Sequence, residues 1–210
     1  VIRRRGRTAH ATQGRLLLVE DIKKEIRDWS RHALEVPNPD FNNLPPCPYA
    51  QAAWQEDKVE IVFKEENSYK LVFDTLKNFN DNKDLVIVVD TYFIEHEDAF
   101  HNYLDRINKC ISENVFKDKD LWVMGFHPYQ DANELIDDGT FEGTTETEYA
   151  LIFVQRLSKL EEASNKLVSR GYYDRYFETY DVSEMYKIRK EYYRRLQCAD
   201  QRRQAQLNEE

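Results

Sequence analysis

Three runs of mostly apolar residues alternate with segments in which apolar residues recur three or four positions apart. The runs Val59–Phe63, Leu85–Val89 and Leu121–Phe126 predict strands, and the second, unbroken run is typical of a strand buried on both faces. Helical spacing predicts helices over residues 20–34, 69–79, 97–113, 157–168 and 183–203, with a short turn or helix over 49–54. The pattern therefore alternates strand and helix through the first two thirds of the chain.

This order predicts an α/β fold, because strand–helix–strand units form right-handed crossovers between parallel strands. We expect one domain over residues 19–171, built on a β-α-β-α-β core. Its sheet should be mostly parallel, three- to four-stranded and flanked by helices. The run Tyr149–Val154 fits either the fourth strand or the start of the next helix.

The two ends of the chain differ from this core. Residues 1–15 hold five arginines and no acidic residue. This composition fits a transit-like or nucleic-acid-binding arm; the alternative, which we adopt, is that residues 1–18 are a disordered basic leader outside the fold. Residues 172–210 are predicted as a C-terminal helical extension with a frayed tail. The whole chain of 210 residues has a net charge of −9, which disfavours nucleic-acid binding by the folded part.

Composition says more about the cellular compartment of the protein than about its activity. No apolar run approaches the roughly 18 residues that a membrane span requires. The three cysteines are widely spaced and show no zinc-site spacing, which predicts a reduced, cytoplasmic setting. The cofactor stays unknown, because the chain contains neither a glycine-rich phosphate loop nor a dinucleotide fingerprint.

Two motifs place a reactive side chain directly before a proline, Cys47-Pro48-Tyr49-Ala50 and Phe126-His127-Pro128-Tyr129. Proline is favoured at the first helical position, and the free amides of a helix start favour thiolate over thiol. His127 closes an apolar run, so it should lie where a buried strand emerges. The motifs together indicate a site without defining a reaction.

Polar residues follow each predicted strand, where ligands gather in open α/β sheets. Asp90 can orient a histidine at a neighbouring strand end, and that imidazole can activate Cys47 as a nucleophile. We therefore predict catalytic roles for Cys47, His127 and Asp90, with ligand contacts from Tyr49, Tyr129 and Glu66. The other interpretation is structural: Asp90 caps the next turn, and His127 is a buried ring with satisfied hydrogen bonds.

A metal held by His127, Asp90 and Glu66 is chemically possible, but no local spacing specifies one, so no metal site is predicted. Cys-Pro-Tyr before a helix also resembles the glutaredoxin active site. Ala50 replaces the second cysteine of that site, which disfavours dithiol exchange and leaves a monothiol role.

The motifs Cys47-Pro48-Tyr49-Ala50 and Phe126-His127-Pro128 together resemble a family of small uncharacterised bacterial proteins, a domain of unknown function. The resemblance extends over about residues 47–163 and departs from that family after Pro128, where the chain continues Tyr129-Gln130-Asp131. Because that family has no settled activity, the resemblance implies the location of a site and not its chemistry.

We expect an enzyme-like Cys/His site at the sheet edge, acting on a small-molecule ligand. The chemistry is either monothiol nucleophilic or His- or metal-assisted acid–base. The acidic segment 128–147 is expected to act as a lid over this site. The alternative is a non-catalytic interaction or regulatory module that binds a protein partner through the Tyr/Arg-rich residues 172–203.

Overall fold

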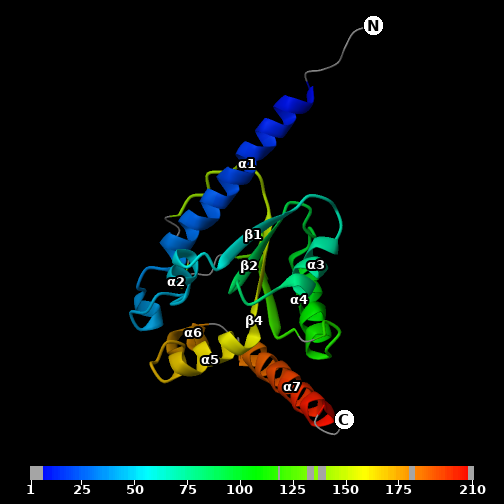
Figure 1. Ribbon diagram of the computed structural model, residues 1–210. Helices are drawn as coiled ribbons and strands as arrows, with labels where there is room; N and C mark the ends of the chain where they lie inside the picture. Colours follow the sequence, from blue (N-terminus) through cyan, green and yellow to red (C-terminus); the bar gives the residue numbers. More distant parts are fainter. Residues whose placement is uncertain (1–6, 118, 132–134, 137–140, 180–182, 208–210) are drawn as a thin grey trace.

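A four-stranded sheet lies at the centre of the computed structural model, which describes residues 7–117, 119–131, 135–136, 141–179 and 183–207. The strands are β1 (Val59–Lys64), β2 (Leu85–Asp90), β3 (Leu121–Phe126) and β4 (Ala150–Arg156). Their spatial order is β1-β2-β4-β3 (Figure 1). β1 pairs with β2 in parallel, whereas β4 is antiparallel to both β2 and β3. The α/β class is confirmed.

The sheet is mixed, so the prediction of a mostly parallel sheet is wrong. Strands β1, β2 and β3 do run in one direction, linked through α3 (Lys70–Asn78) and α4 (Glu97–Ser112). The connection from β3 to β4 leaves and re-enters the sheet at the same end of the strands, so β4 must run in the opposite direction to β3. The first five residues of β4 are all buried, which suits a central place between β2 and β3.

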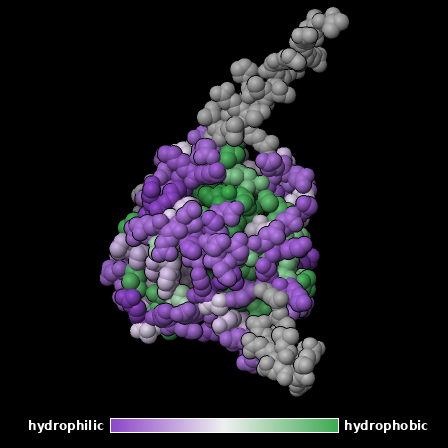
Figure 2. Space-filling model, viewed as in Figure 1, coloured by the Kyte–Doolittle hydropathy of each residue, from purple (hydrophilic) through white to green (hydrophobic). Residues whose placement is uncertain are grey.

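One face of the sheet is covered by α1 (Arg7–Trp29) and the short α2 (Ala50–Gln55) (Figure 1). Ile22 and Ile26 of α1 pack in one apolar cluster with Ile87 of β2. Figure 2 shows hydrophobic surface on this side of the molecule, where α1 runs past the sheet. Part of this cluster is therefore not fully covered.

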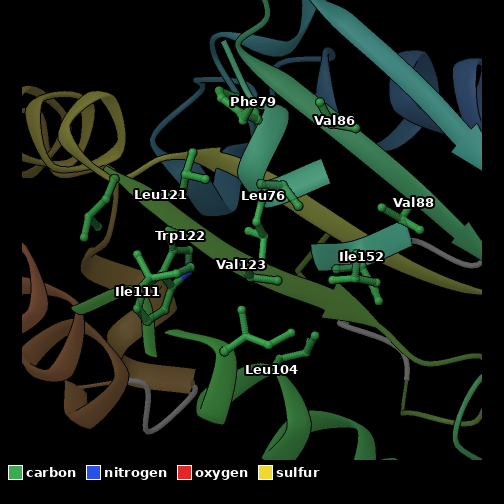
Figure 3. Close-up of a cluster of buried hydrophobic side chains, with 14 of the residues drawn as sticks. Leu76, Phe79, Val86, Val88, Leu104, Ile111, Leu121, Trp122, Val123 and Ile152 are labelled. Atoms are coloured by element: carbon green, nitrogen blue, oxygen red, sulfur yellow. The ribbon is translucent and has the colours of Figure 1, made fainter. Parts of the chain in front are cut away.

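The other face is covered by α3, α4 and α7 (Ser183–Leu207). The cluster on this face contains Leu76, Val86, Val88, Leu104, Ile111 and Ile152 (Figure 3). At Gly125, α4 and β4 come so close that an added Cβ would lie 2.7 Å from the carbonyl oxygen of Leu151 and 2.8 Å from Leu104. A side chain at this position would require the packed elements to move apart.

The outer edge of β3 is covered by side-chain amides. The Asn108 carboxamide donates to the Val123 carbonyl and accepts from the Val123 amide, both at 2.8 Å. Directly after the end of β3, the His127 amide donates to Gln130 Oε1 at 2.8 Å. These contacts occupy backbone groups that another strand would otherwise use.

The C-terminal helices belong to the same folded body as the sheet. After α5 (Leu157–Val168) and α6 (Asp174–Thr179), α7 contacts α4 and α5. Arg189 of α7 forms a buried ion pair with Glu161, and α7 also contributes Leu196 to the apolar cluster on the α3 and α4 face of the sheet. The predicted extension is therefore helical, and its final helix shares the core; residues 208–210 of the expected tail lie outside the described residues.

The N-terminal helix is longer than its apolar pattern predicts. It begins at Arg7, so residues 7–18 of the expected disordered leader are helical, while residues 1–6 lie outside the described residues. Alanine, arginine, glutamine and leucine are good helix formers and extend a helix that is already anchored by packing. α1 continues into a π-helical turn, Ser30–Leu34, and then a 3₁₀ turn, Pro39–Phe41. Within the described parts of the chain, no helix is both long and apolar enough to cross a bilayer.

Candidate functional site

The carboxyl ends of β1 and β2 hold a buried ion pair between Lys64 and Asp90, each 1% exposed. The Lys64 ammonium donates to both Asp90 oxygens, at 2.8 and 2.9 Å, and to the Tyr92 carbonyl at 3.0 Å. Asp90 also accepts from the Tyr92 amide at 2.9 Å. All three ammonium protons are used, so the pair fastens β1 to β2 and to the following turn.

Two tyrosines in ring-to-ring contact lie beside this pair. The Lys64 ammonium is 4.8 Å from the centre of the Tyr69 ring, which packs 4.3 Å from the ring of Tyr103. The Tyr103 hydroxyl is buried and has no hydrogen-bond partner among the described residues. Burial, with further contributions from Tyr69 and the Asp90 charge, raises the pKa of Tyr103. This phenol stays protonated at neutral pH.

His127 lies at the end of β3 and is 3% exposed. Its Nε2 lies 2.8 Å from the Ile94 carbonyl, and its Nδ1 lies 3.2 Å from the Tyr129 amide. A carbonyl can only accept and an amide can only donate, so Nε2 carries the proton and the ring is neutral. The Phe93 ring meets the imidazole edge-on at 5.2 Å.

The expected hydrogen bond between Asp90 and His127 does not form. β4 lies between β2 and β3, so the two residues are not at neighbouring strand ends. The Asp90 carboxylate is bonded to Lys64, and both ring nitrogens of His127 are bonded to backbone groups. The contacts match the structural interpretation of both residues.

Cys47 precedes α2, as its motif predicts, but its surroundings favour the thiol over the thiolate. Burial raises the pKa of the thiol, the backbone amides of Tyr49 and Ala50 oppose this shift, and the charge of Glu35 adds to it. The net direction is upward, opposite to the expected activation. Both Cys47 and His127 lie within the described residues, and no hydrogen bond joins them.

The three residues expected to contact a ligand, Tyr49, Tyr129 and Glu66, do not form one site: no recorded contact joins them or gives them a common partner within the described residues. The exposed Tyr129 donates its hydroxyl to Glu148 at 2.7 Å and packs beside Phe93. Tyr49 is the exposed residue before α2, and Glu66 lies in the exposed turn before α3. The segment expected to be a lid is anchored at Leu135, whose carbonyl accepts from the Asn38 side chain; residues 132–134 and 137–140 lie outside the described residues.

A cavity of about 220 Å³ lies between α1 and the β3–β4 side of the sheet, where the sequence indicated no site. It is lined by Glu25, Ile26, Trp29, Phe126, Phe141, Tyr149 and Leu151. The Trp29 and Phe126 rings meet edge-to-face at 5.6 Å. Four of the seven lining residues are aromatic, and Glu25 is the one lining residue whose side chain is charged at neutral pH.

Glu25 is 9% exposed and accepts only from neutral donors. These are the amides and hydroxyls of Thr144 and Thr145 and the Tyr149 hydroxyl, the last at 2.6 Å. Burial tends to raise the pKa of Glu25, but the hydrogen bonds from Tyr149, Thr145 and Thr144 outweigh it and hold the pKa below its ordinary value. The carboxylate is therefore ionised, and no ion pair to it is recorded within the described chain.

The sequence contains one signal for this cavity. Glu25 lies directly before Ile26 in a helix whose apolar residues include Ile22 and Trp29. A glutamate beside an apolar stripe is common on helices and does not by itself indicate a site. Its partner Thr144 lies 119 positions away in the sequence, so the sequence alone does not reveal their contact.

No family model, curated protein or solved structure matches the chain. The resemblance to a domain of unknown function therefore stays a prediction. Over the residues that the structure describes, no group of three or more His, Cys, Asp or Glu side chains is placed to hold a metal ion.

Proposed function

We propose that this chain is a binding protein for a small organic cation with an N-methylated ammonium head, held in the cavity beneath α1. The observation that carries the proposal is Glu25, a buried carboxylate whose partners are all neutral, set beside four aromatic rings.

The charge of Glu25 favours a cationic ligand. A buried ionised group is costly unless an opposite charge lies close to it. Hydrogen bonds from Thr144, Thr145 and Tyr149 stabilise the carboxylate without neutralising it. A cation in the cavity would supply the missing charge, and the net charge of −9 would attract it.

The aromatic lining favours a methylated head group over a bare ammonium. Trp29, Phe126, Phe141 and Tyr149 offer ring faces and edges, and the one hydroxyl among them, that of Tyr149, already donates to Glu25. Quaternary ammonium groups need no hydrogen bonds and are attracted to aromatic rings. The volume, about 220 Å³, is below that of cavities for drug-sized molecules, so it suits a head group with its remainder in solvent.

The cavity supports binding better than catalysis, because its lining contains no cysteine, serine, histidine or lysine. The predicted enzyme-like site at Cys47 and His127 remains a proposal with less support. The thiol has a raised pKa, and the imidazole is held by backbone groups.

Titration calorimetry with choline tests the proposal. The matched ligand is the neutral isostere of choline in which carbon replaces the quaternary nitrogen. Choline should bind saturably with a dissociation constant of about 1 mM, which corresponds to a binding free energy of about −4 kcal/mol. The isostere should bind at least about tenfold more weakly, because it differs from choline in its charge alone.

Two variants assign the binding to the cavity. Trp29→Leu removes one ring, and a desolvated cation–π contact of up to about 2 kcal/mol corresponds to a loss of about thirtyfold. Phe73→Leu alters a ring that is 46% exposed on α3, outside the cavity lining, and should leave choline binding unchanged. Equal affinity for choline and its isostere, or equal loss in both variants, would contradict the proposal.

Protein binding through residues 172–203 is a second candidate function, supported by fewer residues than the sequence pattern indicated. Tyr172, Tyr173 and Tyr186 pack within an internal aromatic cluster, so they are not available to a partner. The exposed side chains of Met185 and Ile188 support this candidate. Replacing both by serine should abolish such binding without changing choline affinity.

A further inference from the structure

The two outer strands of the sheet, β3 and β1, differ in whether side chains bond to their outward backbone groups. At β3, the side chains of Asn108 and Gln130 occupy backbone groups of Val123 and His127. At β1, no comparable contact is recorded within the described residues. An edge strand with free peptide groups is a template for another strand.

The direction of the β1 peptide groups follows from one hydrogen bond. The Lys58 carbonyl accepts from the Leu85 amide at 3.2 Å, so position 58 directs its backbone toward β2. Because this direction alternates along a strand, Val59, Ile61 and Phe63 direct their peptide groups to the open side.

Three consecutive side chains in this edge strand, which follow the exposed Glu60, are apolar and incompletely covered. Ile61, Val62 and Phe63 are all partly buried, and Ile61 and Phe63 belong to the cluster beneath α1, together with the partly buried Leu18. A partner strand would extend that cluster.

We infer that β1 pairs antiparallel with β1 of a second copy of this chain, around a two-fold axis at Val62. Outward peptide groups then meet in pairs, Ile61 opposite Phe63 of the other copy. The same register sets Lys58, before the strand, opposite Glu66, after it, so opposite charges meet at both ends. Shifting the axis to Ile61 would instead set Lys58 opposite Lys64.

The resulting sheet has eight strands, because each copy contributes four. Its two outer edges are both β3, the edge covered by Asn108 and Gln130. The dimer therefore closes by two-fold symmetry, and at both of its outer edges the Val123 groups and the His127 amide are already bonded to side chains.

Charge exchange tests the register in the full chain. Lys58→Glu should raise the dimer dissociation constant at least about tenfold, measured by sedimentation equilibrium, because two ends of the paired strands become repulsive. Adding Glu66→Lys should restore it. Lys77→Glu on α3 makes the same charge change away from β1 and should have no effect.

Hydrogen exchange supplies a readout that is independent of those charges. The outward amides of Val59, Ile61 and Phe63 should become slower to exchange as protein concentration rises across the dimer dissociation constant, in wild type and not in Lys58→Glu. A chain that stays monomeric at about 1 mM, far above typical specific dissociation constants, overturns the inference. So does a dimer that Lys58→Glu leaves unchanged, or one in which β3 gains the protection. Choline affinity is measured separately, so either proposal can fail alone.

Discussion

Removal of the Lys64 ammonium should be among the most damaging single changes in this protein. Lys64→Met keeps a long apolar side chain but deletes three donated hydrogen bonds, two to Asp90 and one to the Tyr92 carbonyl. Asp90 is 1% exposed and would keep only the Tyr92 amide as a partner. Leaving a buried charge without its counterion costs about 3–5 kcal/mol, a large share of the 5–15 kcal/mol typical of folded domains.

The double variant Lys64→Met/Asp90→Leu shows whether this cost comes from the isolated charge. Replacing both members of a buried ion pair by apolar side chains is often close to neutral, so the double variant should recover most of the lost free energy of unfolding. Urea unfolding followed by circular dichroism measures all three proteins at constant m-value. The matched control, Lys70→Met, removes the exposed pair with Asp74 and should leave the urea midpoint unchanged. A single variant as stable as wild type, or a double variant worse than the single one, would refute this account.

Four further outcomes are expected. Asn108→Ala should cost about 2–4 kcal/mol, because two buried backbone groups of β3 lose their partners, and should increase light scattering on storage; an unchanged protein would argue against edge covering. Gly125→Ala should cost about 1–3 kcal/mol in urea unfolding, because its Cβ would lie 2.7 Å from a β4 carbonyl and 2.8 Å from Leu104 of α4; a neutral result would mean that both β4 and α4 shift easily to make room. With the other two cysteines replaced by serine, Cys47 should alkylate at pH 7 more slowly than a free thiol, since burial raises its pKa; a faster reaction would restore the nucleophile hypothesis. The depressed pKa of Glu25 stabilises the fold above the unfolded value of about 4.3 and this stability is lost as pH falls through the folded value, so Glu25→Gln should flatten the acid limb of the stability profile, and an unchanged limb would contradict the assigned hydrogen bonds.

The sequence predicts the elements of this fold better than their arrangement. Apolar period and β-branching locate all three predicted strands, and α7 begins at the predicted Ser183. The run Ala150–Val154, by contrast, contains no local pattern that indicates which strands it pairs with. Its place between β2 and β3 depends on where the long connection after His127 returns, which no local pattern encodes.

The candidate site shows the same division between local and distant contacts. The local rule that a helix start activates a thiol is valid, yet at Cys47 burial by the rest of the protein outweighs it. The cavity beneath α1 depends on Glu25 meeting Thr144 and Tyr149 across most of the chain. Such a site becomes visible only when the fold is known.

The central position of β4 also sets the order in which this chain can fold during synthesis. β1, α3, β2 and α4 leave the ribosome first, and β1 can pair with β2 at once. β3 has no sheet partner until β4 is complete at Arg156, because β4 is its one neighbour. The apolar run Leu121–Phe126 therefore waits unpaired while at least thirty further residues are added, which at roughly 5–20 residues per second takes seconds. That interval makes β3 the strand at which a nascent chain is most exposed to aggregation and to chaperones.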